Sequence, residues 1–341
     1  MGLQIGEIIP REEISIESLS GKIIAVDAFN TIYQFLTTIR QIDGTPLMDR
    51  KGNVTSHLSG LFYRSVNLMN KGLKLVYVFD GEAPELKEKT HAIRREIKEE
   101  AAAKFETAET IEEKAKYAAR TSVLTNEMIE ESKELLSALG LPVIQAPGEG
   151  EAQASYMAKQ GDVYAAASQD YDPLLFGAPR LIQNLTLARK RKLPSGLSVS
   201  INPELITLQK VLNTLQLNQD QLICMGILSG TDYNPKGVKG IGPKKALKFV
   251  SSYKAPALVF KEIGKLPEYN ISFDWQAVFE LFKKPNVTKK YDLKFRQVDK
   301  EKLKAILVKE HDFSEERIGS ALDKLQEQKE QKKQRDLKKY F

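Results

Sequence analysis

The stretch PGEGEAQASYMAKQGDVYAAASQDYDPLLFG, residues 147–177, carries two acidic pairs, each with i, i+2 spacing. Glu149 and Glu151 form the first pair, and Asp170 and Asp172 form the second. Each pair follows an apolar run of strand length and precedes a loop or the start of a helix. In an open parallel sheet, groups just past the carboxyl ends of strands gather along one edge, where ligands bind. Four carboxylates on one edge repel each other, so this stretch predicts a divalent metal among them.

The same pattern recurs towards the N-terminus, where two further apolar runs end in Asp27 and Asp80. A single acid at the end of a strand is commonly just a loop residue, but a fourfold recurrence with helical crossovers is hard to dismiss. We therefore expect an α/β fold: a mostly parallel twisted sheet flanked by helices, with an acidic edge. The expected strands are 21–27, 73–80, 141–145 and 162–167, and the expected helices between them include 56–70, capped by Ser56, 126–139 and 151–160.

Length and charge limit the possible classes of protein. The chain has 341 residues, enough for a sizeable core, with 51 basic against 45 acidic residues and a net charge of +6. Such a surface favours a polyanion as partner, with nucleic acid ahead of anionic lipid. The lone Cys224 lies in an apolar run, which indicates a reducing compartment, and three scattered histidines disfavour a zinc site. No run approaches 18 apolar residues and no signal-peptide pattern is present, so we expect a soluble, cytoplasmic protein with no membrane partner.

An oversized insertion, residues 81–125, begins immediately after Asp80. It is rich in helix-forming and charged residues but poor in large apolar ones, so it buries little of itself. One interpretation is a solvated helical pair with i, i+4 ion pairs. Its position favours a mobile cap over the acidic edge. Lys87 and Arg94 are seven residues apart and are expected to share a helical face that points towards that edge.

Beyond residue 177, a basic segment predicts a loop or hairpin, and residues 219–250 carry a helix-hairpin-helix signature. Gly240 and Gly242 link the two helices, and glycine lets the backbone approach a phosphate while helix N-terminal amides supply donors. A tight turn between helices would explain the glycines but not the lysines around them. Asp232, just upstream, could join the acidic set. The flanking lysines are Lys236, Lys239, Lys244 and Lys245.

The chain ends in QRDLKKYF after a polar run, 325–333, that we expect to be frayed or disordered. On one tight turn, Leu337, Tyr340 and Phe341 would form a hydrophobic plug, with Gln334 beside it. Two terminal aromatics on a polar tail imply a partner that receives them. The alternative is that both aromatics fold back onto the core of this protein. We therefore divide the chain into a folded body, 1–326, and a flexible tail, 327–341.

Together, AVDAFNTIYQFL, TSHLSGLFYR, VYVFDG, APGEGEAQA, SQDYDPLLFG and GTDYNPKGVKGIGPKKA resemble the structure-specific 5′ flap endonucleases, in order and spacing, over essentially the whole chain. The resemblance implies two Mg²⁺ ions, for which Mn²⁺ can substitute, and a K⁺ at the hairpin. It implies that the insertion is a helical arch whose Lys87 and Arg94 meet the scissile phosphate, and that Tyr33 stacks near the reacting nucleotide. Arg40 and Arg64 match positions that contact DNA, as does the hairpin through Lys239, Gly240, Gly242, Lys244 and Lys245. The implied metal ligands are Asp27, Asp80, Glu149, Glu151, Asp170, Asp172 and Asp232.

The resemblance further implies removal of 5′ flaps and 5′–3′ exonuclease activity on flap and nicked duplex DNA, in replication and repair. It implies a monomer whose C-terminal motif binds a sliding clamp (PCNA). The motif stands at the extreme end without a basic extension, which favours an archaeal protein; a eukaryotic one would be nuclear. Two alternatives remain open: a non-catalytic junction or clamp adaptor, favoured by loss of an acid, and a toxin-like or RNA-processing nuclease, usually shorter and without hairpin or tail.

Overall fold

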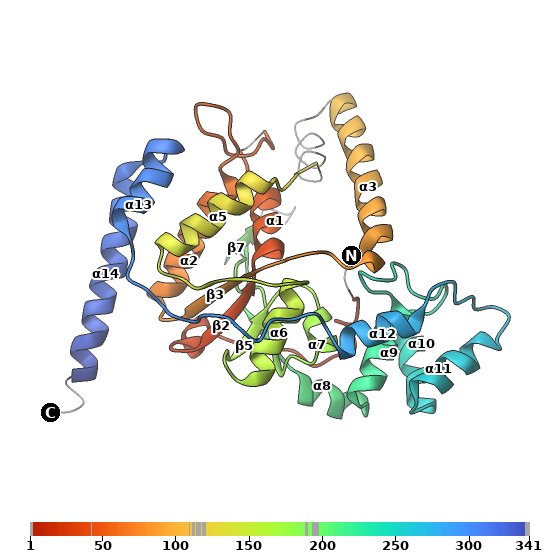
Figure 1. Ribbon diagram of the computed structural model, residues 1–341. Coiled ribbons are helices and arrows are strands. Elements are labelled where there is room, and N and C mark those ends of the chain that lie inside the picture. Colours follow the sequence, from red (N-terminus) through yellow and green to blue (C-terminus); the bar gives the residue numbers. More distant parts are fainter. Residues whose placement is uncertain are drawn as a thin grey trace.

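Alternating apolar side chains build a seven-stranded sheet at the centre of the computed structural model, in the order β1-β9-β6-β5-β2-β3-β4 (Figure 1). Five neighbouring strands, β6, β5, β2, β3 and β4, run parallel, whereas β9 and β1 add antiparallel pairs at one side. The predicted α/β class is therefore confirmed. The structure describes residues 3–41, 43–108, 110, 113, 117, 121–187, 190–192 and 198–337.

The predicted strands are present, and each is shorter than its apolar run. A separate antiparallel hairpin, β7 and β8, confirms that the basic segment contains a hairpin. The strands are β1 (Glu12–Glu13), β2 (Ile23–Asp27), β3 (Lys74–Phe79), β4 (Val143–Gln145), β5 (Ala165–Ala167), β6 (Arg180–Gln183), β7 (Lys190–Lys192), β8 (Ser198–Ser200) and β9 (Glu204–Thr207).

Alternate residues of the strands face two different cores. In β3, Leu75, Tyr77 and Phe79 pack in a core with α1, α2, α5 and the C-terminal helices, whereas Val76 and Val78 pack against α6. A third core joins α7 to α12 at one end of the sheet. The helices around these cores are α1 (Ala28–Thr38), α2 (Ser56–Asn70), α5 (Asn126–Ala138), α6 (Gly150–Gln160), α7 (Asp172–Leu175), α8 (Leu208–Leu215), α9 (Gln219–Ser229), α10 (Pro243–Ser252), α11 (Pro256–Gly264), α12 (Trp275–Lys283), α13 (Lys300–Lys304) and α14 (Glu315–Leu337).

The insertion contains a short 3-10 turn, η2 (Glu85–Lys87), and a long helix, α3 (Glu88–Thr107), that projects from the body (Figure 1). Lys87 therefore ends the turn rather than sharing the helix with Arg94, which corrects the expected common helical face. Parts of 109–120 lie outside the described residues. Within the described part of the chain, no helix is both long and apolar enough to span a bilayer.

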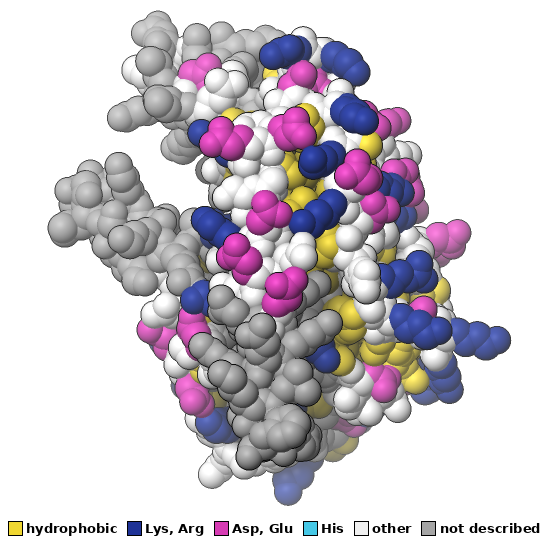
Figure 2. All heavy atoms as spheres, turned by 90° about the vertical axis from the view of Figure 1, so that its left-hand side faces the viewer, with side chains coloured by type: hydrophobic (Ala, Val, Ile, Leu, Met, Phe, Trp, Pro, Cys, Tyr) yellow, Lys and Arg dark blue, Asp and Glu magenta, His cyan; other side chains and the backbone are white. Residues whose placement is uncertain are grey.

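Three further expectations differ from the structure. Thr55 precedes α2, and Ser56 instead uses its hydroxyl to donate to Ile39 O and accept from Leu47 N–H, which fixes the preceding loop. The sequence of residues 255–325 predicts helices, but residues 285–299 cross the body as an extended segment between α12 and α13. The last helix, α14, continues to Leu337, past the expected tail boundary at 327. Its face carries interspersed acidic and basic side chains (Figure 2).

Candidate active site

The carboxyl edge of the parallel strands brings the predicted acids to one place. Asp27 ends β2 and caps α1 by accepting the backbone N–H of Asn30 at 3.1 Å. Asp80 follows β3 and accepts the N–H of Gly150 at 2.7 Å. A Cβ at position 150 would lie 2.7 Å from the same Asp80 oxygen, so glycine between the two glutamates lets α6 begin against β3.

Glu149 and Glu151 flank this glycine, as the residue before α6 and a residue of its first turn. Asp172 begins α7 directly after the loop that follows β5. Two neutral side chains hold the set in place: Asn30 donates to Asp170 at 2.9 Å, and Ser168 donates to Glu151. Because β5, β2, β3 and β4 are consecutive in the sheet, acids far apart in sequence become neighbours.

Burial and mutual repulsion disfavour the charged forms of these acids. Burial, and then Asp80, raise the pKa of Asp27 well above its usual value. Burial, and then Asp27, do the same to the pKa of Glu151. Burial and then the neighbouring Asp170 raise the pKa of Asp172 to about 8. Carboxylates of this kind are stabilised in the charged form by a cation among them.

Two observations test whether a metal fits these residues. Within the described residues, Asp172 Oδ1 is buried without a hydrogen-bond partner, so this oxygen could accept a metal ion. The candidate ligands are all carboxylate oxygens, which are the ligands that Mg²⁺ prefers. Across the same part of the chain, however, no three Asp, Glu, His or Cys side chains converge closely enough to form a metal site as they stand. The residue types and their placement fit a divalent ion, and side-chain rotations would be needed to share it.

Among the side chains that the structure describes, Lys87 is the cation that lies within this set. The Lys87 ammonium forms an ion pair with Glu149 Oε1 and is 3.7 Å from Asp232 Oδ2. Burial lowers the pKa of Lys87, but Glu149, Asp232 and Glu151 outweigh this effect and leave that pKa raised, so Lys87 is charged. Thr90 of α3 donates to the backbone oxygen of Asp232, which ties the base of the insertion to the acidic edge.

The other predicted DNA-contacting residues have different surroundings. Tyr33 on α1 is 37% exposed, and the Lys98 ammonium of α3 lies 5.4 Å from its ring centroid. Arg40 instead binds its own chain, donating to Leu36 O at 3.0 Å and to Gly44 O at 2.7 Å. Arg64 is half-buried on α2. The backbone of Arg94 lies in α3, and its side chain lies outside the described residues.

The predicted helix-hairpin-helix is present between α9 and α10. Gly240 has a φ of +84°, in the left-handed region that favours glycine, and Gly242 caps α10 ahead of Pro243. Lys245 donates to Gly240 O at 3.0 Å, so it stabilises the turn, whereas Lys244 is exposed. Lys239 is also exposed. Lys239 and Lys244 are therefore the exposed lysines beside the two glycines of the turn that make no hydrogen bond to it among the described contacts.

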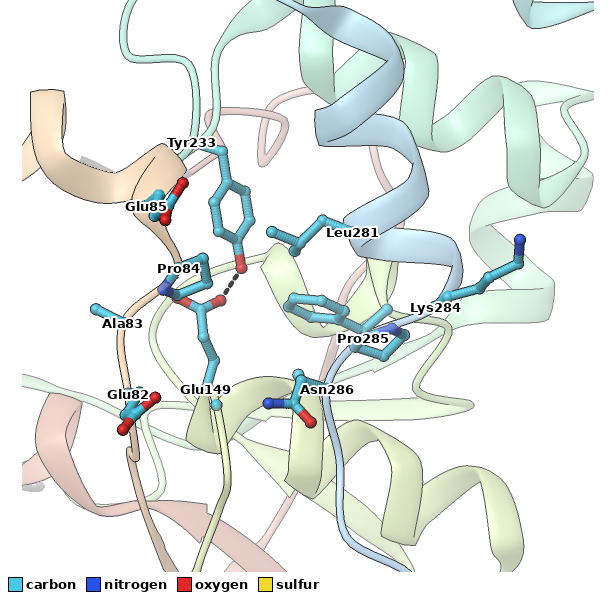
Figure 3. Close-up of a pocket in the computed structure, with 13 residues that line it drawn as sticks. Glu82, Ala83, Pro84, Glu85, Glu149, Tyr233, Leu281, Lys284, Pro285 and Asn286 are labelled. Carbon is cyan, nitrogen blue, oxygen red and sulfur yellow. Dashed lines mark hydrogen bonds between the residues drawn. The ribbon is translucent and has the colours of Figure 1, made fainter.

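Sequence reasoning missed three side chains that organise the acids: Asn30, Ser168 and Tyr233. Figure 3 shows Tyr233 on the wall of a cavity of about 360 Å³, with its hydroxyl directed at Glu149. Leu281 and Asn286 line another part of the same cavity. The hydroxyl donates to Glu149 Oε2. Tyr233 follows Asp232 directly, and this adjacency is the signal that could have found it.

The residues predicted to bind a clamp are only partly within the described chain. Gln334 and Leu337 belong to the last turns of α14, where the structure describes the backbone but not the side chains. Tyr340 and Phe341 lie outside the described residues.

A parallel sheet whose carboxyl edge gathers acids beside a charged helical insertion and a helix-hairpin-helix defines a metal-dependent nuclease that acts on DNA. Comparison with known families identifies which kind. The chain matches the XPG N-terminal domain over residues 4–101 and the XPG I-region over residues 140–232. It is 54% identical to flap endonuclease 1 of Pyrococcus furiosus over 345 aligned residues, covering 100% of this chain and 99% of the relative.

Other relatives agree. Flap endonuclease 1 of Hyperthermus butylicus is 52% identical, covering 95% of this chain and 94% of the relative. The solved flap endonuclease-1 of Methanococcus jannaschii superposes with a TM-score of 0.77 at 45% identity, covering 97% of this chain and all of that one. The catalytic core of Rad2 with DNA substrate shares the fold, with a TM-score of 0.73 at 24% identity, covering 95% of this chain and 100% of that one. The chain belongs to the flap endonuclease 1 family: it is a structure-specific nuclease that hydrolyses phosphodiester bonds with a divalent metal.

Proposed function

We propose that the seven acids of the carboxyl edge hold two Mg²⁺ ions, which Mn²⁺ can replace, and that the enzyme removes 5′ flaps at duplex junctions. The observation that carries this assignment is the buried, mutually repelling set of acids with Lys87 inserted among them. When bound, the ions supply an activated water and neutralise the leaving 3′ oxygen. The set comprises Asp27, Asp80, Glu149, Glu151, Asp170, Asp172 and Asp232.

The side chains around the acidic edge then bind the DNA and neutralise its charge. Lys87 and Arg94 neutralise charge that develops on the scissile phosphate. Tyr33, half-exposed beside α3, stacks on the nucleotide next to it. Arg40 and Arg64 contact the DNA on either side, although the guanidinium of Arg40 would first have to leave its partners in its own chain.

The helix-hairpin-helix grips the duplex backbone through Gly240 and Gly242, with a K⁺ among its carbonyls and with Lys239, Lys244 and Lys245 beside it. Such a grip sets register without reading bases, so selectivity follows the shape of the junction. We further propose 5′–3′ exonuclease activity on nicked duplexes, a monomeric enzyme, and a sliding clamp held through Gln334, Leu337, Tyr340 and Phe341. The archaeal relatives support a cytoplasmic role in replication and repair.

The test is incubation with a double-flap DNA, with and without Mg²⁺, and mapping of the cut. Cleavage at the junction that depends on Mg²⁺ is expected for the native protein. Asp172→Asn should abolish cutting while DNA binding persists, and Asp323→Asn, an exposed acid on α14, is the matched control. Cutting by Asp172→Asn at the native rate would contradict the ligand assignment. If the native protein binds the junction without cutting it, this result would instead support a non-catalytic adaptor.

A further inference from the structure

The Tyr233 side chain connects the third hydrophobic core to the acidic edge. Its ring is buried and meets Phe282 of α12 edge-on, with centroids 5.2 Å apart. The same side chain lines the cavity of about 360 Å³, together with Phe176 and Leu281. Because packing fixes the ring, the hydroxyl has a defined position at the boundary between core and edge (Figure 3).

That hydroxyl donates to Glu149 Oε2, while the other carboxylate oxygen, Oε1, receives the Lys87 ammonium. The two carboxylate oxygens of Glu149 therefore bind two different groups, the Tyr233 hydroxyl and the Lys87 ammonium. Glu149 precedes α6 and does not cap it with its own side chain, so the local backbone does not fix its rotamer. The orientation of this carboxylate depends on its partners.

The ring of Tyr233 also faces Lys87, whose ammonium lies 5.4 Å from the ring centroid. This distance is within the range of a cation–π contact. The same tyrosine thus contacts an acid through its hydroxyl and a base through its ring. Asp232, the neighbouring residue in the chain, completes the group at 3.7 Å from the ammonium.

We propose that Tyr233 is a positioning residue for the nuclease reaction: it orients Glu149 towards the metal by its hydroxyl and places Lys87 by its ring. Hydrogen bonds to metal-ligating carboxylates orient them and support affinity. The inference rests on the proposed metal set, because it requires Glu149 to be a ligand. It predicts that the hydroxyl and the ring have separable effects.

The hydroxyl is tested by titrating Mn²⁺ into the DNA-free full-length protein by isothermal titration calorimetry. Tyr233→Phe should weaken Mn²⁺ binding by roughly 10- to 100-fold, the usual cost of an outer partner of a metal ligand. Phenylalanine keeps the packing on Phe282, so the melting temperature should stay close to that of the native protein. Tyr291→Phe is the matched control, because it removes another hydroxyl donated to a carboxylate, that of Asp162; Mn²⁺ binding should not change.

A double-mutant cycle separates this inference from the ligand assignment. Glu149→Gln should also weaken Mn²⁺ binding, and Tyr233→Phe should add nothing further in that background. If Glu149→Gln binds Mn²⁺ as tightly as the native protein, the ligand assignment fails and the inference falls with it. If Glu149→Gln weakens binding but Tyr233→Phe does not, or the two losses multiply fully, only the role of Tyr233 is overturned.

The ring is tested by comparing Tyr233→Leu with Tyr233→Phe in single-turnover cleavage at saturating Mg²⁺. Both variants lack the hydroxyl, and only the leucine variant lacks the aromatic face for Lys87. We expect a rate at least several-fold lower for leucine than for phenylalanine. In the Lys87→Ala background the two variants should have equal rates. A difference that persists without Lys87 would overturn the placing role of the ring.

Discussion

Lys87 is the residue at which the opposing charges of the site meet, since one ammonium group faces both Glu149 and Asp232. An interaction made with the developing charge of the phosphate affects the rate more than affinity. We expect Lys87→Ala to lower the single-turnover rate by about 10²- to 10³-fold, the cost of losing one such electrostatic group. Affinity for double-flap DNA, measured by fluorescence anisotropy, should change far less.

The matched control for Lys87 is Lys104→Ala, on the same insertion but exposed and paired with Glu100. It should cut at the native rate. Equal losses of rate and affinity in Lys87→Ala would mean that this lysine only helps to hold the substrate.

The acids of the site could be predicted from sequence because each stands just past an apolar strand, and the order of parallel strands brings such positions together. The hydrogen-bond partners of these acids could not be predicted in this way. Ser168 and Asn30 are ordinary loop and helix residues, and which acid each one binds depends on how α1 and α7 meet the sheet. Arg40 shows the reverse case: the family resemblance predicts a DNA contact, whereas in the folded chain its guanidinium donates to the carbonyls of Leu36 and Gly44.

At the scale of elements, the helix-hairpin-helix distinguishes two adjacent lysines. Lys245 stabilises the turn by its bond to Gly240 O, whereas the Lys244 side chain is 78% exposed and pairs only with the exposed Glu7 carboxylate, at 3.9 Å, among the described residues. Lys244→Ala should weaken binding to all duplex substrates and reduce the salt slope of affinity by about one unit. Lys302→Ala on α13, at the other end of the molecule, is the control (Figure 1). An unchanged slope for Lys244→Ala would show that it faces solvent in the complex.

A second set of elements is joined by a cluster of histidine and acidic side chains. Glu131 of α5 lies 3.3 Å from His57 of α2 and 3.4 Å from His311, and His311 Nδ1 lies 3.1 Å from Asp49. The His311 ring is therefore held between the Asp49 and Glu131 carboxyl groups. The cluster fastens the loop before α2 to the segment before α14.

This cluster predicts a pH-dependent contribution to stability. Burial raises the pKa of Asp49, but hydrogen bonds from Asn53 and His311 outweigh it and lower that pKa to about 2. The stabilisation is therefore present above the ordinary value of 3.8 and is lost as the pH falls towards 2. Asp49→Asn should lower the urea midpoint at pH 7, and its difference from the native protein should shrink below pH 4. Asp323→Asn is the control; a difference for Asp49→Asn that does not depend on pH would contradict the charge-based account.

Elements with strong periodicity were predicted well, and those without it were not. Strands β2 and β3 and helices α2 and α5 have clear apolar patterns that set their position. Residues 285–299 are held instead by contacts with distant parts of the chain, such as Thr288 with Gln153 and Arg296 with Gly140, which no local pattern reveals. The polar end of α14 is expected to fray because it buries little, yet the helix continues to Leu337, consistent with the helix propensity of its Glu, Gln, Lys, Arg and Leu residues.

At the scale of the whole molecule, α14 and the arch helix α3 lie on opposite sides of the body (Figure 1). A partner bound at the C-terminus would therefore leave the DNA side open. Among the side chains of α14 that the structure describes, the buried apolar ones are Ile318, Leu322 and Leu325, all before the expected tail boundary at 327. The described anchoring residues of α14 thus lie in its first half.

Deleting residues 334–341 tests the tail. Ordering a polar segment on a partner costs conformational entropy, which Leu337, Tyr340 and Phe341 must offset by burial in a pocket. Because the anchoring residues of α14 remain, we expect the melting temperature and clamp-free cleavage to stay unchanged, while clamp binding and stimulation disappear. Replacing Tyr340 and Phe341 with Ala at full length should give the same loss without shortening the helix. A marked fall in melting temperature would indicate that the aromatics fold back onto the core, and full stimulation after the deletion would place the clamp site elsewhere.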